Sequence, residues 1–364
     1  MPGTLSLSGA RNLFGIAGAL SLVFAAGCSH RRPIEQLVPA DIETTVFLIG
    51  DAGEQDPRMT SPVLDSLKAQ AAEAPGRTMI VFLGDNVYPA GIPEEGRADY
   101  ADARRRLADQ VNAVPAGVRG IFVPGNHDWS AATAYGLYSV RLEERMITSL
   151  ARGNNVRMLP GNGCPGPAVL DVGRLRFIAL DTQWWLHDFI VRDSTSNCVN
   201  TVGGVTAALR KEVEEVGDGR VVIVGGHHPL MTGGQHGGYC GLSGALRRVG
   251  GRSQDILSGQ NRTMRDSIAS AFRNKKPLLY AAGHDHNLQL MKGPEAQYLL
   301  VSGAGSPSKT ECAVYLRESY YVSQHRTGYI RVDIMKGKGV LLTSYEFVGT
   351  GRRGNPYSRW LEPK

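Results

Sequence analysis

The sequence predicts an α/β fold in which two packed, mixed β-sheets are flanked by helices. Short apolar runs rich in β-branched and aromatic residues alternate with helical patterns along most of the chain. Strand-like segments then follow one another directly towards the C-terminal end. Alternation followed by strand pairs is typical of layered folds in which helices cover the outer faces of the sheets.

Five short apolar segments are predicted to be strands that are buried on both faces. They cover residues 45–49, 78–83, 121–123, 220–224 and 277–281. Each leads into a glycine followed at once by a side chain that can bind a metal: Gly50-Asp51, Gly84-Asp85, Gly125-Asn126, Gly226-His227 and Gly283-His284. Ligands of open α/β sheets collect beyond the carboxyl ends of the strands. The repeated pattern therefore predicts a functional site at that edge.

The segments between and after these strands complete the predicted fold. Helices are predicted at residues 59–73, 100–111, 137–150, 206–216 and 263–272, where apolar residues recur at helical spacing. Further strands are predicted at residues 168–171, 175–180, 297–302, 328–333 and 339–345. We find no internal repeat, so the sequence predicts one catalytic domain over residues 42–348 and a basic tail over residues 349–364.

Composition excludes several classes of protein. Of the 364 residues, 42% are hydrophobic and 20% are charged, which excludes a collagen-like repeat, a long coiled coil and a wholly disordered chain. The net charge of +6 is too small to indicate nucleic-acid binding. No apolar stretch reaches the roughly 18 to 20 residues that a membrane-spanning helix needs, so a multi-span membrane protein is excluded.

The N-terminal residues predict export. Arg11 precedes an apolar run over residues 13–27, and Cys28 ends this run. A basic start, an apolar middle and a small-residue exit are typical of a signal peptide, predicted here at residues 1–27 with a tether at 28–41. The residues up to Cys28 resemble a bacterial lipoprotein signal, which implies a lipid anchor at Cys28 and a periplasmic or cell-surface location. Simple secretion and an uncleaved anchor are the alternatives.

The candidate metal ligands are more numerous than one metal ion needs. They are Asp51, Asp85, Tyr88, Asn126, His227, His284 and His286. Mixed carboxylate, imidazole and amide ligands suit first-row transition metals. Seven ligands exceed the four of a tetrahedral zinc and suit two metals that share one bridging carboxylate. Paired metals about 3.5–4 Å apart are typical of enzymes of phosphoryl transfer.

These motifs resemble those of a known family. The relevant segments are Gly50-Asp51-Ala52-Gly53, Gly84-Asp85-Asn86-Val87-Tyr88, Gly125-Asn126-His127-Asp128, Gly226-His227-His228-Pro229 and Gly283-His284-Asp285-His286. They resemble the calcineurin-like metallophosphoesterases over about residues 44–348, and within them the small, tartrate-resistant type of purple acid phosphatase. The resemblance implies a four-layer αββα sandwich with a dimetal site at the strand ends, in agreement with the pattern of strands.

The resemblance also implies a role for each site residue. A first metal, Fe(III), would be held by Asp51, Asp85, Tyr88 and His286. Asp85 would bridge to a divalent Fe, Zn or Mn, held also by Asn126, His227 and His284. His127 would be the general acid, and His236 would be a histidine on the substrate side. Where the family often has Trp, this chain has Ala52, which removes bulk beside the site.

Some residues near the motifs have simpler interpretations. His228 is predicted to have no metal role, because only one of two adjacent histidines before Pro229 can point inward. His236 lies in a glycine-rich loop, where solvent exposure is the alternative to substrate contact. Trp184 and Trp185 are predicted to be a packed pair, with a place at the rim of the cleft as the alternative.

The predicted function is an exported phosphomonoesterase with a dinuclear metal centre. It would act on a phosphorylated small molecule or protein, with no nucleic-acid partner and with a membrane contact only through the anchor at Cys28. One alternative is a phosphodiesterase of the same fold. A second alternative, from another class, is a non-catalytic surface lipoprotein that binds a phosphorylated partner through a metal site.

The remaining cysteines predict disulfides. Cys164, Cys198, Cys240 and Cys312 form an even set without zinc-ligand spacing, and in an oxidising compartment they indicate two bonds with three pairings. Buried free thiols are the alternative. We expect Cys198–Cys240 and Cys164–Cys312, since the excursions to Cys198 and Cys240 both leave strand ends on the same rim.

Overall fold

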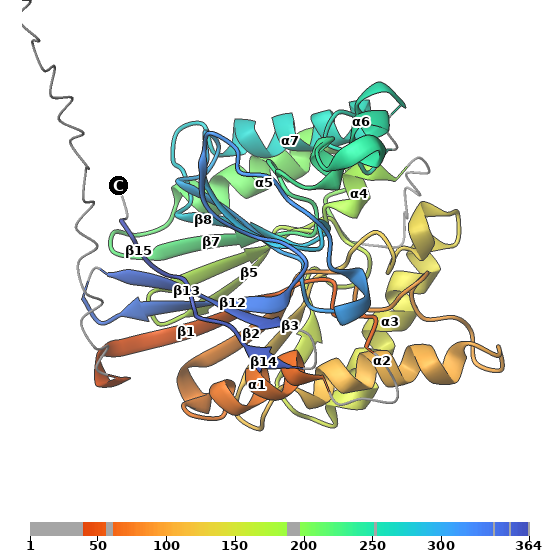
Figure 1. The fold of residues 1–364 in the computed structure, drawn as a ribbon, viewed down its shortest axis with the longest axis horizontal. Helices are drawn as coiled ribbons and strands as arrows, with labels where there is room; N and C mark the ends of the chain where they lie inside the picture. Colours follow the sequence, from red (N-terminus) through yellow and green to blue (C-terminus); the bar gives the residue numbers. More distant parts are fainter. Residues whose placement is uncertain are drawn as a thin grey trace, which may run out of the picture. The chain divides into compact units, whose positions relative to one another are not determined.

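A computed structural model describes residues 39–55, 61–187, 197–250, 253–337, 339–348 and 351–362. Two β-sheets lie face to face, and helices cover the outer face of each sheet (Figure 1). The predicted signal peptide, Cys28 and all but the last residues of the predicted tether lie outside the described residues. Among the described residues, no helix is long and apolar enough to cross a membrane.

The first sheet is mixed and contains eight strands in the order β14-β13-β12-β1-β2-β3-β4, with β15 also paired to β13. The strands are β1 (Ile42–Ile49), β2 (Thr78–Phe82), β3 (Arg119–Phe122), β4 (Val156–Met158), β12 (Thr327–Met335), β13 (Val340–Val348), β14 (Arg352–Arg353) and β15 (Ser358–Leu361). Strands β1 to β4 are parallel, whereas β12 pairs antiparallel with β1. The short strands β14 and β15 lie in the predicted basic tail, so part of that tail extends this sheet.

The second sheet contains seven strands in the order β11-β9-β10-β8-β7-β6-β5. They are β5 (Ala168–Val172), β6 (Leu175–Ala179), β7 (Val221–Gly225), β8 (Leu279–Ala282), β9 (Leu288–Lys292), β10 (Tyr298–Ser302) and β11 (Ser319–Ser323). Strands β6, β7, β8 and β10 are parallel to one another, whereas β5 pairs antiparallel with β6, and β9 pairs antiparallel with both β10 and β11. The two mixed sheets confirm the predicted fold class.

Two groups of helices form the outer layers. Helices α1 (Pro62–Ala71), α2 (Tyr100–Asn112) and α3 (Gly136–Ala151) cover the first sheet, and α4 (Gln183–Leu186), α5 (Val202–Glu214), α6 (Gly241–Gly250) and α7 (Gly259–Ala271) lie on the side of the second. Ser61, Thr201 and Ser258 cap α1, α5 and α7, because each side-chain oxygen accepts a backbone N–H of the first turn.

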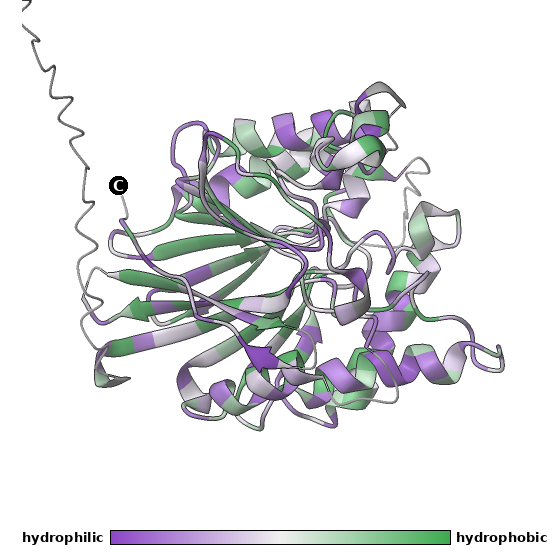
Figure 2. Ribbon diagram, viewed as in Figure 1, coloured by the Kyte–Doolittle hydropathy of each residue, from purple (hydrophilic) through white to green (hydrophobic). Residues whose placement is uncertain are grey.

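Successive side chains of each central strand point to opposite faces of the sheet, which explains the layers of the fold. In β1, Val46 and Leu48 face the core between the sheets. Phe47 and Ile49 face the core beneath the first group of helices, since successive side chains of a strand point to opposite faces. Both faces of the central strands are therefore apolar, and these strands are coloured largely as hydrophobic in Figure 2. This double burial produces the near-continuous hydrophobic runs seen in the sequence.

The cysteines pair differently from the predicted scheme. Disulfides join Cys164 to Cys198 and Cys240 to Cys312. Two disulfides are therefore present, but the predicted pairs Cys198–Cys240 and Cys164–Cys312 are wrong.

Two chain crossings account for the observed pairing. The backbone N–H of Asp181 donates to the carbonyl of Pro165 over 3.1 Å, which brings the segment of Cys164 to the strand end from which the chain departs towards Cys198. The connection between β10 and β11 returns across the loop after β7, where Val314 donates to Gly233 over 3.0 Å. Cys312, rather than Cys198, therefore lies beside Cys240.

Candidate metal centre

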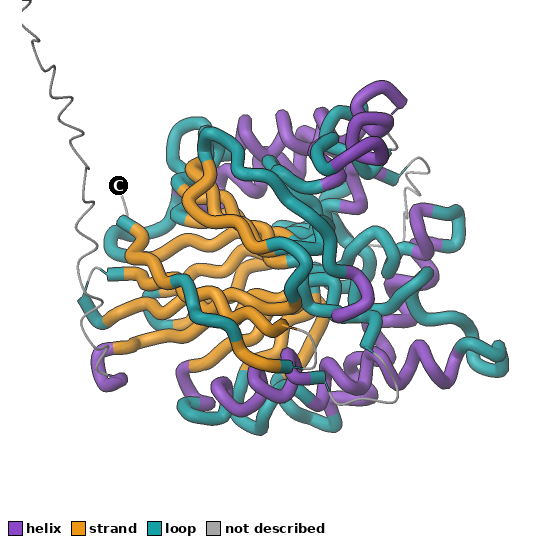
Figure 3. The backbone as a smooth tube through the Cα atoms, viewed as in Figure 1, coloured by secondary structure: helices purple, strands orange, loops and turns teal. Residues whose placement is uncertain are grey.

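The five predicted ligand motifs all follow parallel strands and meet at one place. The strands lead into a band of loops between the two groups of helices (Figure 3). Three motifs follow β1, β2 and β3 of the first sheet, and two follow β7 and β8 of the second. The site therefore spans the ends of both sheets, and no single sheet could supply it.

The glycines allow the strand ends to approach closely. Gly84 has a φ of +90°, and a Cβ at this position would lie 2.6 Å from Nδ1 of His227. The residues after two of the glycines, Asp51 and Asp85, have φ values of 58° and 54°, and His284 has a φ of 72°. Non-glycine residues occupy this left-handed region at an energetic cost and cluster at functional sites. The chain thus tolerates backbone strain at three predicted ligands.

A first group of ligands surrounds the phenol of Tyr88. Its Oη donates to Oδ1 of Asp51 at 2.9 Å and to Oδ2 of Asp85 at 3.0 Å. Nε2 of His286 lies 3.1 Å from the same oxygen and 3.3 Å from Oδ1 of Asp51. Tyr88 and both carboxylates are buried. These four side chains are the set predicted to hold the first metal.

A second group surrounds the amide oxygen of Asn126. This Oδ1 lies 3.0 Å from Nε2 of His227 and 3.1 Å from Nδ1 of His284. The two imidazole nitrogens are 3.2 Å apart. Three potential donor atoms thus converge on one point, as predicted for the second metal.

Asp85 joins the two groups. Its Oδ2 accepts the hydrogen bond from Tyr88, and its Oδ1 lies 3.3 Å from Nε2 of His227. The two oxygens of one carboxylate therefore face different ligand groups. This arrangement fits a carboxylate that bridges two cations, as paired metal sites require.

The electrostatics of the ligand groups fit a cation. Burial, together with the negative charges of Asp51 and Asp85, raises the pKa of Tyr88 well above its usual value. Burial lowers the pKa of His227, but the negative charge and hydrogen bond of Asp85 outweigh this effect and raise the pKa to about 9. The carboxylates thus create a strongly negative potential in a buried place, and a metal ion would neutralise it. The same cation would favour the deprotonated phenol.

Hydrogen bonds to the outer nitrogens orient the histidines. Nδ1 of His227 lies 2.9 Å from the carbonyl of Leu83, and Nε2 of His284 lies 3.2 Å from the carbonyl of Gln254. With these nitrogens protonated, Nε2 of His227 and Nδ1 of His284 keep free lone pairs for a metal. Gln254 belongs to no motif in the sequence, so sequence reasoning missed it.

His286 has a carboxylate partner. Its Nδ1 lies 3.6 Å from Oε1 of Glu311, and the backbone N–H of Glu311 donates to the carbonyl of His286 over 2.8 Å. Glu311 comes from the connection between β10 and β11. A carboxylate behind a metal-binding imidazole is a common supporting arrangement, but nothing in the spacing of Glu311 indicated it.

Asp128 fixes the loops that carry the ligands. Its carboxylate accepts backbone N–H groups from Asn86 at 2.9 Å, from Val87 at 3.1 Å and from Gly125 at 2.7 Å. These bonds join the loop after β2 to the loop after β3. The sequence analysis quoted Asp128 only as part of a motif, and its supporting role emerges from the geometry.

The two predicted catalytic histidines flank the ligand groups. The backbone N–H of His127 donates to Oδ1 of Asp85 over 2.9 Å, and its ring lies 4.4 Å from the ring of Tyr88. The ring of His236 lies 3.9 Å from that of His284. Their roles in catalysis remain predictions, but both side chains lie where a substrate phosphoryl group could meet them.

Three other predicted features have defined places. His228 is buried, and its ring nitrogens lie 2.9 Å from Oγ1 of Thr182 and 2.7 Å from Oε1 of Gln254. A ring nitrogen of His228 also lies within 4.8 Å of ring nitrogens of His227 and His284, so its lack of a metal role stays a prediction. Trp184 and Trp185 are both buried and pack edge to face. Ala52 is also buried, in the core beneath the first helices.

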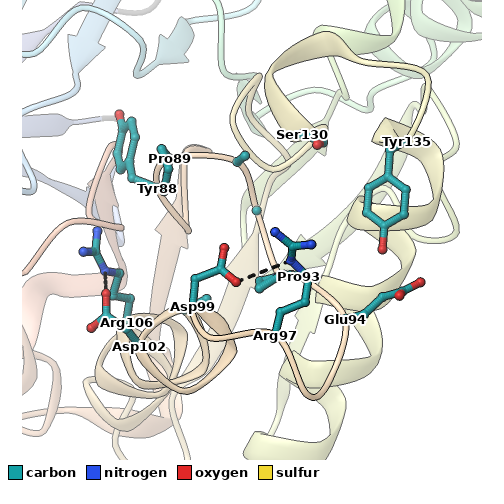
Figure 4. Close-up of a pocket in the computed structure, with 13 residues that line it drawn as sticks. Tyr88, Pro89, Pro93, Glu94, Arg97, Asp99, Asp102, Arg106, Ser130 and Tyr135 are labelled. Carbon is teal, nitrogen blue, oxygen red and sulfur yellow. Dashed lines mark hydrogen bonds and ion pairs between the residues drawn. The ribbon is translucent and has the colours of Figure 1, made fainter.

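A cavity of about 370 Å³ adjoins the first ligand group. Tyr88 and Pro89 line one end, and Tyr135 and Ser130 line the other (Figure 4). Four of its five charged side chains form ion pairs, Arg97 with Asp99 at 3.6 Å and Arg106 with Asp102 at 2.7 Å, and Glu94 is the fifth. The carbonyl of Pro89 lies 2.5 Å from Nδ1 of His127, so the cavity lies on the side of His127.

The chain belongs to the calcineurin-like phosphoesterase family, whose model matches residues 44–288. Membership of this family, together with the two ligand groups, implies a centre of two metal ions. Comparison of the sequence with curated proteins finds no match.

Solved structures share the fold at low sequence identity. GAP50, described as the anchor in the inner membrane complex of Plasmodium, is 16% identical with a TM-score of 0.56, and the match covers 89% of this chain and 90% of that one. Purple acid phosphatase PPD1 from yellow lupin (Lupinus luteus) seeds is 15% identical with a TM-score of 0.54, covering 86% of this chain and 53% of that one. A dimetal phosphatase from Danio rerio is 16% identical with a TM-score of 0.44, covering 88% of this chain and 99% of that one.

Proposed function

We propose that this protein is an exported acid phosphatase that hydrolyses phosphomonoesters at a dinuclear metal centre. The observation that carries the proposal is the position of Asp85. One oxygen of its carboxylate lies in the group of Asp51, Tyr88 and His286, and the other faces His227 of the second group. The phenol in the first group favours Fe(III), and the second group suits a divalent Fe, Zn or Mn.

Two metal ions held in this way supply an activated water molecule and neutralise the charge of a phosphoryl group. The residues of the chain provide the remaining functions. His127 lies beside the first ligand group with its imidazole partly exposed, where it can protonate the oxygen of the leaving group. Because the imidazole must be protonated to do so, we expect an optimum on the acidic side of neutrality.

Two features support a monoester substrate with room for its leaving group. The cavity lined by Tyr88 and Pro89 begins on the side of His127, where the leaving group would depart. Three carboxylates and two guanidinium groups make its lining polar, which suits a hydroxylated leaving group. The substrate would be a phosphorylated small molecule or protein, and the modest net charge gives no support for nucleic acid.

Export is supported by the covalent structure. Disulfides join four of the five cysteines, and stable disulfides are typical of periplasmic, surface and secreted proteins. Together with the predicted signal peptide, this supports a periplasmic or cell-surface location with a lipid anchor at Cys28.

One assay tests the proposed activity against its alternatives. The purified protein is incubated with p-nitrophenyl phosphate and with bis-p-nitrophenyl phosphate, each with and without a chelator. We expect chelator-sensitive hydrolysis that favours the monoester. A preference for the diester would instead identify a phosphodiesterase. Absence of both activities in a metal-loaded protein would favour a non-catalytic role. This alternative is retained because the structural neighbour GAP50 is described as an anchor.

A further inference from the structure

Arg247 of helix α6 lies beside His236, and no motif assigns it a role. Its Nη1 lies 2.9 Å from Nδ1 and 3.3 Å from Nε2 of His236. The same nitrogen donates to Oδ1 of Asp255 over 2.8 Å. The Arg247 side chain is 26% exposed, whereas that of Asp255 is only 1% exposed. A buried carboxylate thus holds a partly open cation beside a predicted catalytic histidine.

This cation lies close to the second ligand group. The ring of His236, which Arg247 contacts, packs against His284 of that group, with 3.9 Å between the ring centroids. One imidazole therefore separates Arg247 from a predicted metal ligand.

The guanidinium of Arg247 has N–H groups that its contacts within the protein do not use. It contacts the imidazole of His236, and among the described residues only Asp255 compensates its charge directly. All of its described polar contacts are made by Nη1. Within the part of the chain that the structure describes, Nε and Nη2 have no such contact. A guanidinium has five N–H donors in a planar fork that matches an oxyanion.

The geometry points to Arg247 as a substrate-binding residue that donates hydrogen bonds to the non-bridging oxygens of a phosphomonoester and selects it over a diester. The inference deepens the proposed function and rests on it. A monoester carries a second negative charge above its second pKa of about 6, whereas a diester carries one charge at any pH in this range. An additional fixed cation therefore favours the monoester. Asp255 acts as the positioning residue, since it holds both His236 and Arg247.

The test measures phosphate binding separately from turnover. Arg247→Ala and Arg247→Lys are compared with the wild type in the metal-loaded full chain, with inorganic phosphate titrated calorimetrically at pH 7. A hydrogen bond to a charged group contributes enough for its loss to weaken binding by roughly 10- to 100-fold. We expect Arg247→Ala to show this loss, and Arg247→Lys an intermediate one, because lysine keeps the charge without the fork.

Arg210→Ala is the matched control. Arg210 is a half-buried arginine of α5 whose Nη2 donates to Oγ of Ser270 over 3.1 Å, and its removal changes the net charge equally. Phosphate binding should be unchanged in this variant. Equal binding in the wild type and in both Arg247 variants would overturn the inference, as would an equal loss in Arg210→Ala.

Turnover provides the second measurement. In Arg247→Ala, kcat/KM for p-nitrophenyl phosphate should fall by roughly 10- to 100-fold, and that for bis-p-nitrophenyl phosphate by much less. An equal fall for both substrates would show that Arg247 only supports the fold around His236 and would overturn the proposed selectivity. If the wild type itself prefers the diester, the proposed function fails, and the binding role of Arg247 is still decided by the phosphate titration.

Discussion

Tyr88 donates its phenolic hydrogen to Oδ1 of Asp51 over 2.9 Å, although the two residues follow different strands of the first sheet. This contact has the geometry expected of two ligands that share one metal ion. The phenol also links Asp51 to Asp85, since its oxygen lies within hydrogen-bond distance of both carboxylates.

Substitution of Tyr88 by Phe tests whether the phenol is an iron ligand. The variant keeps the ring that packs against His127 but lacks the oxygen, so we expect the fold to survive. Phenolate bound to Fe(III) gives a visible charge-transfer band. This band should be present in protein purified from iron-replete cells and absent in Tyr88→Phe, whose iron content should also fall. A colourless, iron-free and fully active wild type would falsify the assignment.

Substitution of His127 by Ala tests the general acid. An alkyl phosphate needs a proton on its leaving oxygen, and loss of a general acid lowers kcat by about 10²- to 10⁴-fold. The p-nitrophenyl ester should be less affected, because p-nitrophenolate leaves readily without a proton. Rates of both substrates are compared at the optimum pH. A small and equal effect on both would mean that His127 is not the acid.

Substitution of Glu311 by Gln tests the carboxylate behind His286. Glutamine keeps the shape but removes the charge that faces Nδ1 of His286 at 3.6 Å. Removal of such supporting groups lowers metal affinity by about 10- to 100-fold, which competition with a chelator measures directly. Glu212→Gln, at a surface ion pair with Arg176, should leave metal affinity unchanged. Unaltered affinity in Glu311→Gln would contradict the supporting role.

Asp181 should make stability depend on pH. Its burial, opposed only in part by a hydrogen bond from Trp129, raises its pKa from 3.8 to about 7. The folded state therefore holds this proton more tightly than the unfolded state. The free energy of unfolding should fall as pH rises from about 4 to 7, by up to about 4 kcal/mol for this group.

Asp181→Asn isolates this contribution. Measured by urea unfolding at pH 5 and pH 8, the variant should gain stability relative to the wild type at the higher pH. Asp171→Asn provides a control without pH dependence in this range. The hydrogen bond from Arg176 lowers the pKa of Asp171 below its usual 3.8 despite partial burial, so this carboxyl group is ionised in both the folded and the unfolded state at pH 5 and at pH 8. A difference between wild type and Asp181→Asn that does not vary with pH would refute the prediction.

The sequence predicts that the candidate ligands meet at one place because the pattern is local. Each strand leads into a glycine, and the next residue faces the crevice, so the spacing of Asp85 and His227 from their strands is visible in the chain itself. Parallel strands bring such residues to one edge. The strand order within each sheet was not needed to predict that these residues meet.

The parts that escaped prediction come from long loops. Gln254, Asp255 and Glu311 lie in connections with no periodic pattern, and their positions depend on how those connections cross the site. The prediction of the disulfide pairing was wrong for the same reason. It depends on the backbone contact between Val314 and Gly233, which no spacing of cysteines reveals.

The Cys240–Cys312 bond makes one side of the candidate metal centre sensitive to the redox conditions around the protein. It fastens the loop that carries His236, and the start of the helix that carries Arg247, to the segment that carries Glu311. The metal ligands that follow strand ends do not depend on this bond. Reduction of this bond should therefore weaken phosphate binding even when the metal content is unchanged. Phosphate affinity, measured with and without a thiol reductant at constant metal content, would then report the oxidation state of this one bond.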